Sequence, residues 1–180
     1  MARRAVRAGP YPPAVTTLGI DPGMAAWGFG VVRRAGDRLK LLEYGSHRTA
    51  SDERSELRLK QIHDEMVSIL ERHEPEAVAL EDSYVGANPR TALSVGQARG
   101  AILVACASAG VRCTEYPPSA VKQAVCGYGR ADKAQVQRMV RSILRLEGDP
   151  RPHHASDALA IAICHALAAP MPEAAGGRRS

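Results

Sequence analysis

The chain has 180 residues, a formal net charge of +5 and only 4% aromatic residues. At this length a single domain can bury a core without disulfides or metals to hold it together. No apolar run reaches the ~20 residues of a membrane-spanning helix, and the arginine-bearing N-terminus lacks the apolar segment of a secretory signal. We therefore expect neither a membrane protein nor a secreted one.

The cysteines stand singly in apolar surroundings, with no C-x-x-C pair. They are Cys106, Cys113, Cys126 and Cys164. Such spacing favours reduced, mostly buried thiols over a zinc site or a disulfide framework. We therefore expect the protein to be cytoplasmic.

Charge is distributed unevenly along the chain. Residues 50–82 hold four basic and ten acidic side chains, whereas residues 83–145 hold nine basic and two acidic ones. Charge runs of this kind are usually solvated helix faces. A strongly basic segment also fits binding to a polyanion such as nucleic acid.

The first part of the chain predicts a tail, three strands and a helix. Residues 1–14 combine three arginines with three prolines, which is typical of a disordered basic tail. Residues 16–20, 28–33 and 38–48 are joined by short turns and predict an antiparallel meander. Residues 52–73 change to a helical period, with their apolar side chains on one face.

The middle of the chain predicts a buried strand and an unusually apolar helix. Residues 77–81 form a short apolar run, fit for a strand buried on both faces. Residues 88–109 open with Asn-Pro, which favours a helix start. This helix is apolar most of the way round and carries Gly96 and Gly100, so beside core packing we expect a subunit interface.

The last part predicts one more strand, three helices and a second tail. Residues 111–116 form the strand and residues 117–124 a short helix. An Asp-x-x-Gln capping box opens the helix of residues 132–146. Residues 153–168 form an amphipathic helix, and residues 169–180 a disordered tail.

Two predicted strands end in a carboxylate. Asp21 closes the first strand before a Pro-Gly turn, and Glu81 closes the fourth. A strand that follows a crossover helix lies parallel to an earlier one, so these carboxylates can meet at one sheet edge. His154 and Asp157 share a face in the first turn of the last helix and can join them. The alternative for Asp21 is an Asx-turn with the amides that follow it.

This set of side chains suggests a metal centre. Packed carboxylates repel one another unless they are protonated or bridged by cations. Oxygen ligands suit Mg²⁺ or Mn²⁺, and two such ions ~3.5–4 Å apart can clamp the attacking and leaving oxygens of a phosphodiester. The order of elements then predicts an α/β, ribonuclease H-like domain over residues 15–168, with a mixed five-stranded sheet flanked by helices.

Six short motifs occur in order and evenly spaced between about residue 15 and residue 168. They are LGIDPG (18–23), LEDSYVGAN (80–88), GQARG (96–100), VKQ (121–123), ADKAQV (131–136) and SDALAIA (156–162). Together they resemble the Holliday junction resolvase RuvC family. The resemblance implies a homodimeric crossover junction endodeoxyribonuclease of DNA recombination and repair, which nicks two opposed strands of a four-way DNA junction. It also implies two Mg²⁺ or Mn²⁺ ions per subunit and a branch-migration partner of the RuvA–RuvB kind.

The resemblance implies roles for individual residues. Metal-bound carboxylates are expected at Asp21, Glu81 and Asp157. Lys122 and Lys133 match the basic residues that the family places near the cleaved strand. Tyr84 matches its aromatic position near the junction centre. The full set of expected DNA contacts is Tyr84, Arg90, Lys122, Arg130 and Lys133.

One position departs from the family pattern. Many members carry a fourth carboxylate where this chain has His154. Imidazole ligates these metals less readily than oxygen, or it can act as a base on the attacking water. The alternative is a weakened site. His153 is the neighbouring candidate, but only His154 has the i, i+3 spacing to Asp157.

Three other functions fit parts of this pattern. One is a ribonuclease H-like nuclease with another substrate. Another is a two-lobed sugar-kinase or actin-like ATPase, whose phosphate loop also follows a strand that ends in Asp; its need for a second lobe argues against it at 180 residues. The last is a protein that binds junctions without cutting them.

Overall fold

The computed structural model describes residues 15–82 and 89–168. Its strands are β1 (Val15–Asp21), β2 (Ala26–Ala35), β3 (Arg38–Arg48), β4 (Ala77–Glu81) and β5 (Cys113–Tyr116). Its helices are α1 (Ser55–His73), α2 (Pro89–Ser108), α3 (Pro118–Cys126), α4 (Lys133–Leu144) and α5 (His153–Ala168). The expectations for the two tails, for Asn88 and for Tyr84 fall outside the described residues.

The sheet has five strands in the order β3-β2-β1-β4-β5. β1, β2 and β3 form the expected antiparallel meander, and β4 lies parallel to both β1 and β5. α1 carries the chain across the sheet, which is why β4 returns parallel to β1. The prediction of a mixed five-stranded sheet flanked by helices is confirmed.

Two predicted bounds shift for local reasons. β5 begins at Cys113 instead of residue 111, because the Val111 amide donates to the Cys106 carbonyl at the end of α2. α4 ends at Leu144 instead of residue 146, because Arg145 adopts a left-handed conformation with φ of 54° and ends the helix. Neither shift moves a predicted site residue.

Other bounds differ by a few residues. β1 is longer than predicted because its ladder with β2 runs from Val15 to Asp21, and β2 is longer because both of its ends pair with β3. α1 begins at Ser55 instead of residue 52. α3 runs on to Cys126, where Gly127 takes a φ of 83° and ends it.

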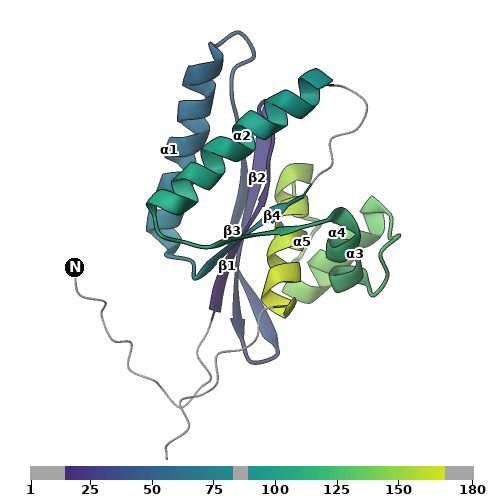
Figure 1. Ribbon diagram of the computed structural model, residues 1–180. Helices are drawn as coiled ribbons and strands as arrows, with labels where there is room; N and C mark the ends of the chain where they lie inside the picture. Colours follow the sequence, from purple (N-terminus) through teal and green to yellow (C-terminus); the bar gives the residue numbers. More distant parts are fainter. Residues whose placement is uncertain (1–14, 83–88, 169–180) are drawn as a thin grey trace, which may run out of the picture.

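Helices cover both faces of the sheet (Figure 1): α1 and α2 lie on one face, and α3, α4 and α5 on the other. The first core packs Leu18 and Ile20 of β1 against α1 and α2. The second core packs α3, α4 and α5 against Val32 of β2 and Ala79 of β4. No helix of the described ranges combines the length and the apolar character that a membrane span requires.

α5 lies directly against the backbone of β1 and β2. A Cβ built at Gly19 would stand 2.2 Å from the Ala158 carbonyl oxygen, and one at Gly28 would stand 2.0 Å from the His154 carbonyl oxygen. Ordinary carbon–oxygen contacts are about 3.3 Å or longer. Only glycine lets the helix sit this close, so the two glycines set the depth of α5 over the sheet.

Candidate active site

β1 and β4 end side by side at one edge of the sheet. Their parallel register pairs Ile20 with Leu80, so Asp21 and Glu81 follow at the same edge. Only 14% of the Asp21 side chain is exposed. The parallel register brings the ends of the two strands side by side, and a shared site for their carboxylates stays a prediction.

The turn after Asp21 is held by α1. Arg58 Nη2 donates to the Met24 carbonyl at 3.2 Å, and its Nε donates to Thr49 Oγ1 at 2.9 Å. The Thr49 hydroxyl in turn donates to the same Met24 carbonyl at 2.5 Å. Sequence reasoning missed this brace, because Arg58 reads as one of many charges on the solvated face of a helix.

α5 places His154 beside Asp21. The distance from His154 Nδ1 to Asp21 Oδ2 is 2.6 Å. An ionised carboxylate only accepts hydrogen bonds, so Nδ1 carries the proton and Nε2 is left for another partner. The hydrogen bond to Asp21 raises the pKa of His154 above its usual 6.5, against the effect of burial; the charges of Asp21 and Asp157 add to the rise.

α4 places Lys133 beside Asp157. The helix opens with the predicted capping box. The backbone N–H of Gln135 donates to Asp132 Oδ1 at 2.8 Å, and the backbone N–H of Asp132 donates to Gln135 Oε1 at 2.9 Å. Lys133 follows the cap, and its Nζ donates to Asp157 Oδ2 at 2.8 Å. The cap thus fixes the start of α4 where its first side chain reaches α5.

A hollow of about 220 Å³ opens between the ends of β4, α3, α4 and α5. Its charged lining consists of Glu81, Lys122, Lys133 and Asp157. Its apolar wall consists of Pro118, Val121, Val136 and Ala160. Two acids and two bases from four separate elements therefore face one space.

The donor set fits a hard divalent cation, but the described side chains are arranged in pairs. In the described ranges no group of three or more His, Cys, Asp and Glu side chains lies close enough to hold a metal ion. Asp21 contacts His154, and Asp157 contacts Lys133. Lys133 offsets the charge of Asp157, and His154 donates a hydrogen bond to Asp21. Carboxylate oxygens with one imidazole remain the ligands that suit Mg²⁺ or Mn²⁺.

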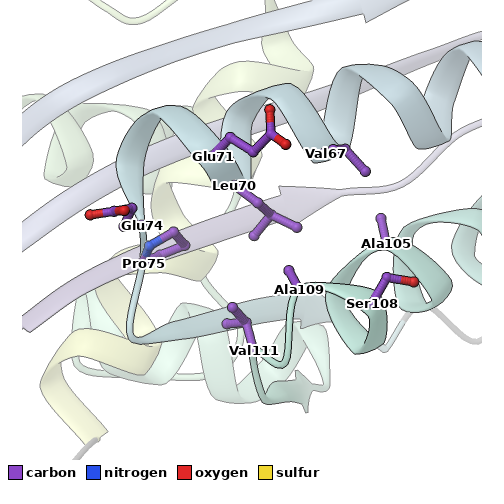
Figure 2. Close-up of a pocket in the computed structure, with 9 residues that line it drawn as sticks. All are labelled: Val67, Leu70, Glu71, Glu74, Pro75, Ala105, Ser108, Ala109 and Val111. Carbon is purple, nitrogen blue, oxygen red and sulfur yellow. The ribbon is translucent and has the colours of Figure 1, made fainter. Parts of the chain in front are cut away.

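A second hollow, of about 430 Å³, lies between the C-terminal ends of α1 and α2 (Figure 2). Its lining is mainly apolar, including Leu70, Ala105 and Val111, with Glu71 and Glu74 also present. None of the predicted site residues lines it. Four of the predicted residues, Glu81, Lys122, Lys133 and Asp157, line the smaller hollow instead.

Comparisons with known proteins agree with this geometry. A sequence model described as "Crossover junction endodeoxyribonuclease RuvC" matches residues 17–165. The chain belongs to the RuvC family. A RuvC protein of Chloroflexus aggregans is 52% identical over 153 residues, which is 85% of this chain and 93% of that protein. Nucleases of the RuvC family are metal-dependent.

Solved structures show the same fold. RuvC of Thermus thermophilus in complex with a Holliday junction substrate is 42% identical, with a TM-score of 0.82 over 86% of this chain and 94% of that one. The yeast mitochondrial Holliday junction resolvase Ydc2 has a TM-score of 0.61 at 10% identity, over 88% of this chain and 82% of that one. The second likeness concerns the fold alone. The predicted ribonuclease H-like fold of a RuvC protein is confirmed.

The other residues predicted from the sequence are Arg90, Arg130, Tyr84 and, as the neighbour of His154, His153. Arg90 is exposed in the first turn of α2, and Arg130 is exposed between α3 and α4. Tyr84 lies outside the described residues. His153 Nδ1 pairs with Gln137 Nε2 at 2.8 Å and so turns toward α4, whereas His154 turns toward Asp21.

Proposed function

We propose that this chain is a metal-dependent endonuclease that resolves four-way (Holliday) junctions by paired, symmetric nicks in DNA recombination and repair. The observation that carries the proposal is the hollow in which Glu81 and Asp157 face Lys122 and Lys133. Carboxylates can take divalent cations, and the lysines can take a phosphate. The four-way junction is supported as the substrate by the complex of the 42% identical Thermus thermophilus RuvC.

We infer that Asp21, Glu81, Asp157 and His154 hold two Mg²⁺ or Mn²⁺ ions per subunit. Bound there, the ions would polarise the scissile phosphate and lower the pKa of the attacking water. His154 donates through Nδ1 to Asp21, so its Nε2 is the atom that binds a metal or accepts a proton once the ring is neutral. The hydrogen bond from His154 to Asp21 also fixes the orientation of the imidazole ring.

Basic side chains provide the DNA-binding part of the proposal. Lys122 and Lys133 face the carboxylates and would neutralise the scissile phosphate. Lys133 would give up its hydrogen bond to Asp157 and donate to a phosphate oxygen instead. Arg90 and Arg130 are exposed and would contact the DNA backbone farther from the cut. Tyr84 would stack on unpaired bases at the crossover, where such stacking is worth ~1–3 kcal/mol per base.

A homodimer would form through α2. Two exposed apolar side chains, Leu93 (65% exposed) and Val104 (58% exposed), lie on this helix. Between them, Gly96 and Gly100 have no neighbouring atom within 4 Å of a built Cβ. The spacing of these four residues puts them on one helix face, where the glycines would let a second backbone approach. Two symmetric nicks require two sites at a fixed distance.

The cellular setting follows from the same family. We propose that the nuclease domain spans residues 15–168 and works with a branch-migration complex of the RuvA–RuvB kind. All four cysteines are free, which fits the reducing cytoplasm.

A cleavage assay tests the proposal. Four-way, three-way and duplex DNA are incubated with the protein in Mg²⁺ or Mn²⁺, and we expect symmetric nicks in the four-way junction alone. Asp21→Asn, Glu81→Gln and Asp157→Asn should abolish cutting while junction binding persists. Asp64→Asn, at an exposed carboxylate paired with Lys60 on α1, is the control and should cut normally.

The alternative with an observation in its favour is a junction-binding protein that does not cut. Its carboxylates would remain paired with His154 and Lys133, as they are in the described side chains. Tight junction binding with no nicks in either metal would favour this alternative. Equal cutting of duplex and three-way DNA would instead indicate a ribonuclease H-like nuclease with another substrate.

A further inference from the structure

Arg99 of α2 contacts the end of β4. Its Nη1 donates to the Glu81 carbonyl oxygen at 2.8 Å. Its Nη2 forms an ion pair with Glu115 of β5 and lies 3.9 Å from Asp82 Oδ1. Only 20% of the Arg99 side chain is exposed. One guanidinium therefore joins α2 to the ends of two neighbouring strands.

The Glu81 carbonyl needs this donor because the ladder cannot supply one. Val78 and Asp82 donate their amides to β5, so the alternation of the strand turns the Glu81 carbonyl toward β1. If the parallel register is continued past Ile20 and Leu80, the residue that would donate to it is Pro22, which follows β1 and has no N–H. A half-buried carbonyl without a donor is costly, and Arg99 supplies the missing hydrogen bond.

The same position makes Arg99 a link to the proposed dimer face. Arg99 lies between Gly96 and Gly100 on α2, and the neighbouring Ala98 and Ile102 are buried in the core. α2 is therefore anchored to the sheet on one side, while its glycine side is open. Arg99 therefore connects α2 directly to the main chain of Glu81.

We infer that Arg99 is a positioning residue that holds the end of β4, and with it the Glu81 carboxylate, in the geometry needed for cleavage. Arg99 contacts the main-chain carbonyl of Glu81 and so would act on the carboxylate through the backbone. The inference deepens the proposed nuclease function and rests on it for the role of Glu81. Outer partners that orient metal-binding carboxylates typically contribute about 10–100-fold in metal affinity or activity.

The test compares Arg99→Met and Arg99→Lys with the exposed control Arg112→Met, at the opposite end of β5. We expect Arg99→Met to lower kcat on four-way junctions by about 10–100-fold, with unchanged junction affinity measured without metal. Arg99→Lys keeps one donor and should recover part of the loss. Mn²⁺ binding to the DNA-free protein, followed by calorimetry, should weaken in the same order. Arg112→Met should match the wild type in every measurement.

Hydrogen exchange gives a readout that does not depend on cutting. The Asp82 amide donates to the Tyr116 carbonyl at 2.8 Å and the Val78 amide to the Arg112 carbonyl at 3.0 Å. In Arg99→Met we expect the Asp82 amide to exchange faster while the Val78 amide stays protected. Equal exchange of Asp82 in the two proteins, or normal kcat in Arg99→Met, would overturn the inference. A wild type that cuts no junction would refute the nuclease proposal instead, and the exchange result would still decide the anchoring role.

Discussion

Gly28→Ala gives a direct test of how the active site is assembled. Gly28 pairs with Asp21 across the β1–β2 ladder, and the His154 carbonyl of α5 lies over it. The added Cβ would stand 2.0 Å from that oxygen, about 1.3 Å short of an ordinary contact. Both atoms of the clash belong to backbone or a fixed Cβ, so the N-terminal turn of α5 must move outward.

The size of the effect follows from that displacement. A misplacement of ~1 Å of catalytic groups can cost ~100-fold in rate, so we expect kcat to fall by roughly that factor. Overpacking of this kind costs ~1–3 kcal/mol of folding free energy, against a typical total of ~5–15 kcal/mol. The variant should therefore stay folded. Because the lysines proposed to bind DNA lie on α3 and α4, junction affinity should change little.

Gly45→Ala is the matched control. Its Cβ would stand 2.8 Å from the Phe29 ring, so it introduces a core clash in the same sheet without touching α5. Single-turnover cleavage, junction binding and thermal unfolding are measured for both variants. A Gly28→Ala protein that cuts within threefold of the wild type, or a Gly45→Ala protein that loses as much activity, would refute the reasoning.

Further predictions concern the charged residues and the dimer. Glu81→Gln should lower the cleavage rate roughly 100-fold or more, because Lewis-acid stabilisation is worth several kcal/mol, while gel-shift affinity for the junction persists. Lys133→Ala removes the partner of Asp157 and should slow single-turnover cleavage about 10–100-fold; an unchanged rate would contradict its role at the site. The raised pKa of His154 keeps the ring protonated above pH 6.5, so activity that needs neutral Nε2 should fall as the pH drops through a midpoint above that value, and His154→Asp should move the midpoint down toward the carboxyl range near ~4. Superimposable pH–rate profiles would rule this out. Gly100→Leu fills open space on α2 and should give a folded monomer by sedimentation, whereas a monomeric wild type at micromolar concentration would contradict the dimer.

The edge of the sheet could be predicted because its signals are local. Asp21 and Glu81 each stand where an apolar strand stops, and the crossover rule makes the two strands parallel. The glycine within the first strand, Gly19, is a further local signal, because a missing side chain allows close approach of another backbone, and α5 lies within 2.2 Å of a Cβ built there. His154 and Asp157 were placed by helical spacing alone.

The contacts among these residues could not be predicted in the same way. Lys133 and Asp157 are 24 positions apart, and Asp21 and His154 are 133 apart. Nothing in either local pattern specifies that one will donate to the other. Arg99 was hidden for a related reason: its proposed role depends on the missing amide of Pro22, which follows the neighbouring strand β1 and lies far from Arg99 in the sequence. Pairings set by tertiary packing leave no periodic signal in the chain.

The packing of α5 on β1 and β2 has a consequence for synthesis of the protein. A nascent chain emerges N-terminus first, at roughly 5–20 residues per second, so the meander and β4 are made well before α5. During that time the strand-end acids are present but Asp157 and His154 are still missing. If these two residues hold metal as proposed, docking of α5 on β1 completes the site, and a partly translated chain should not yet cut DNA.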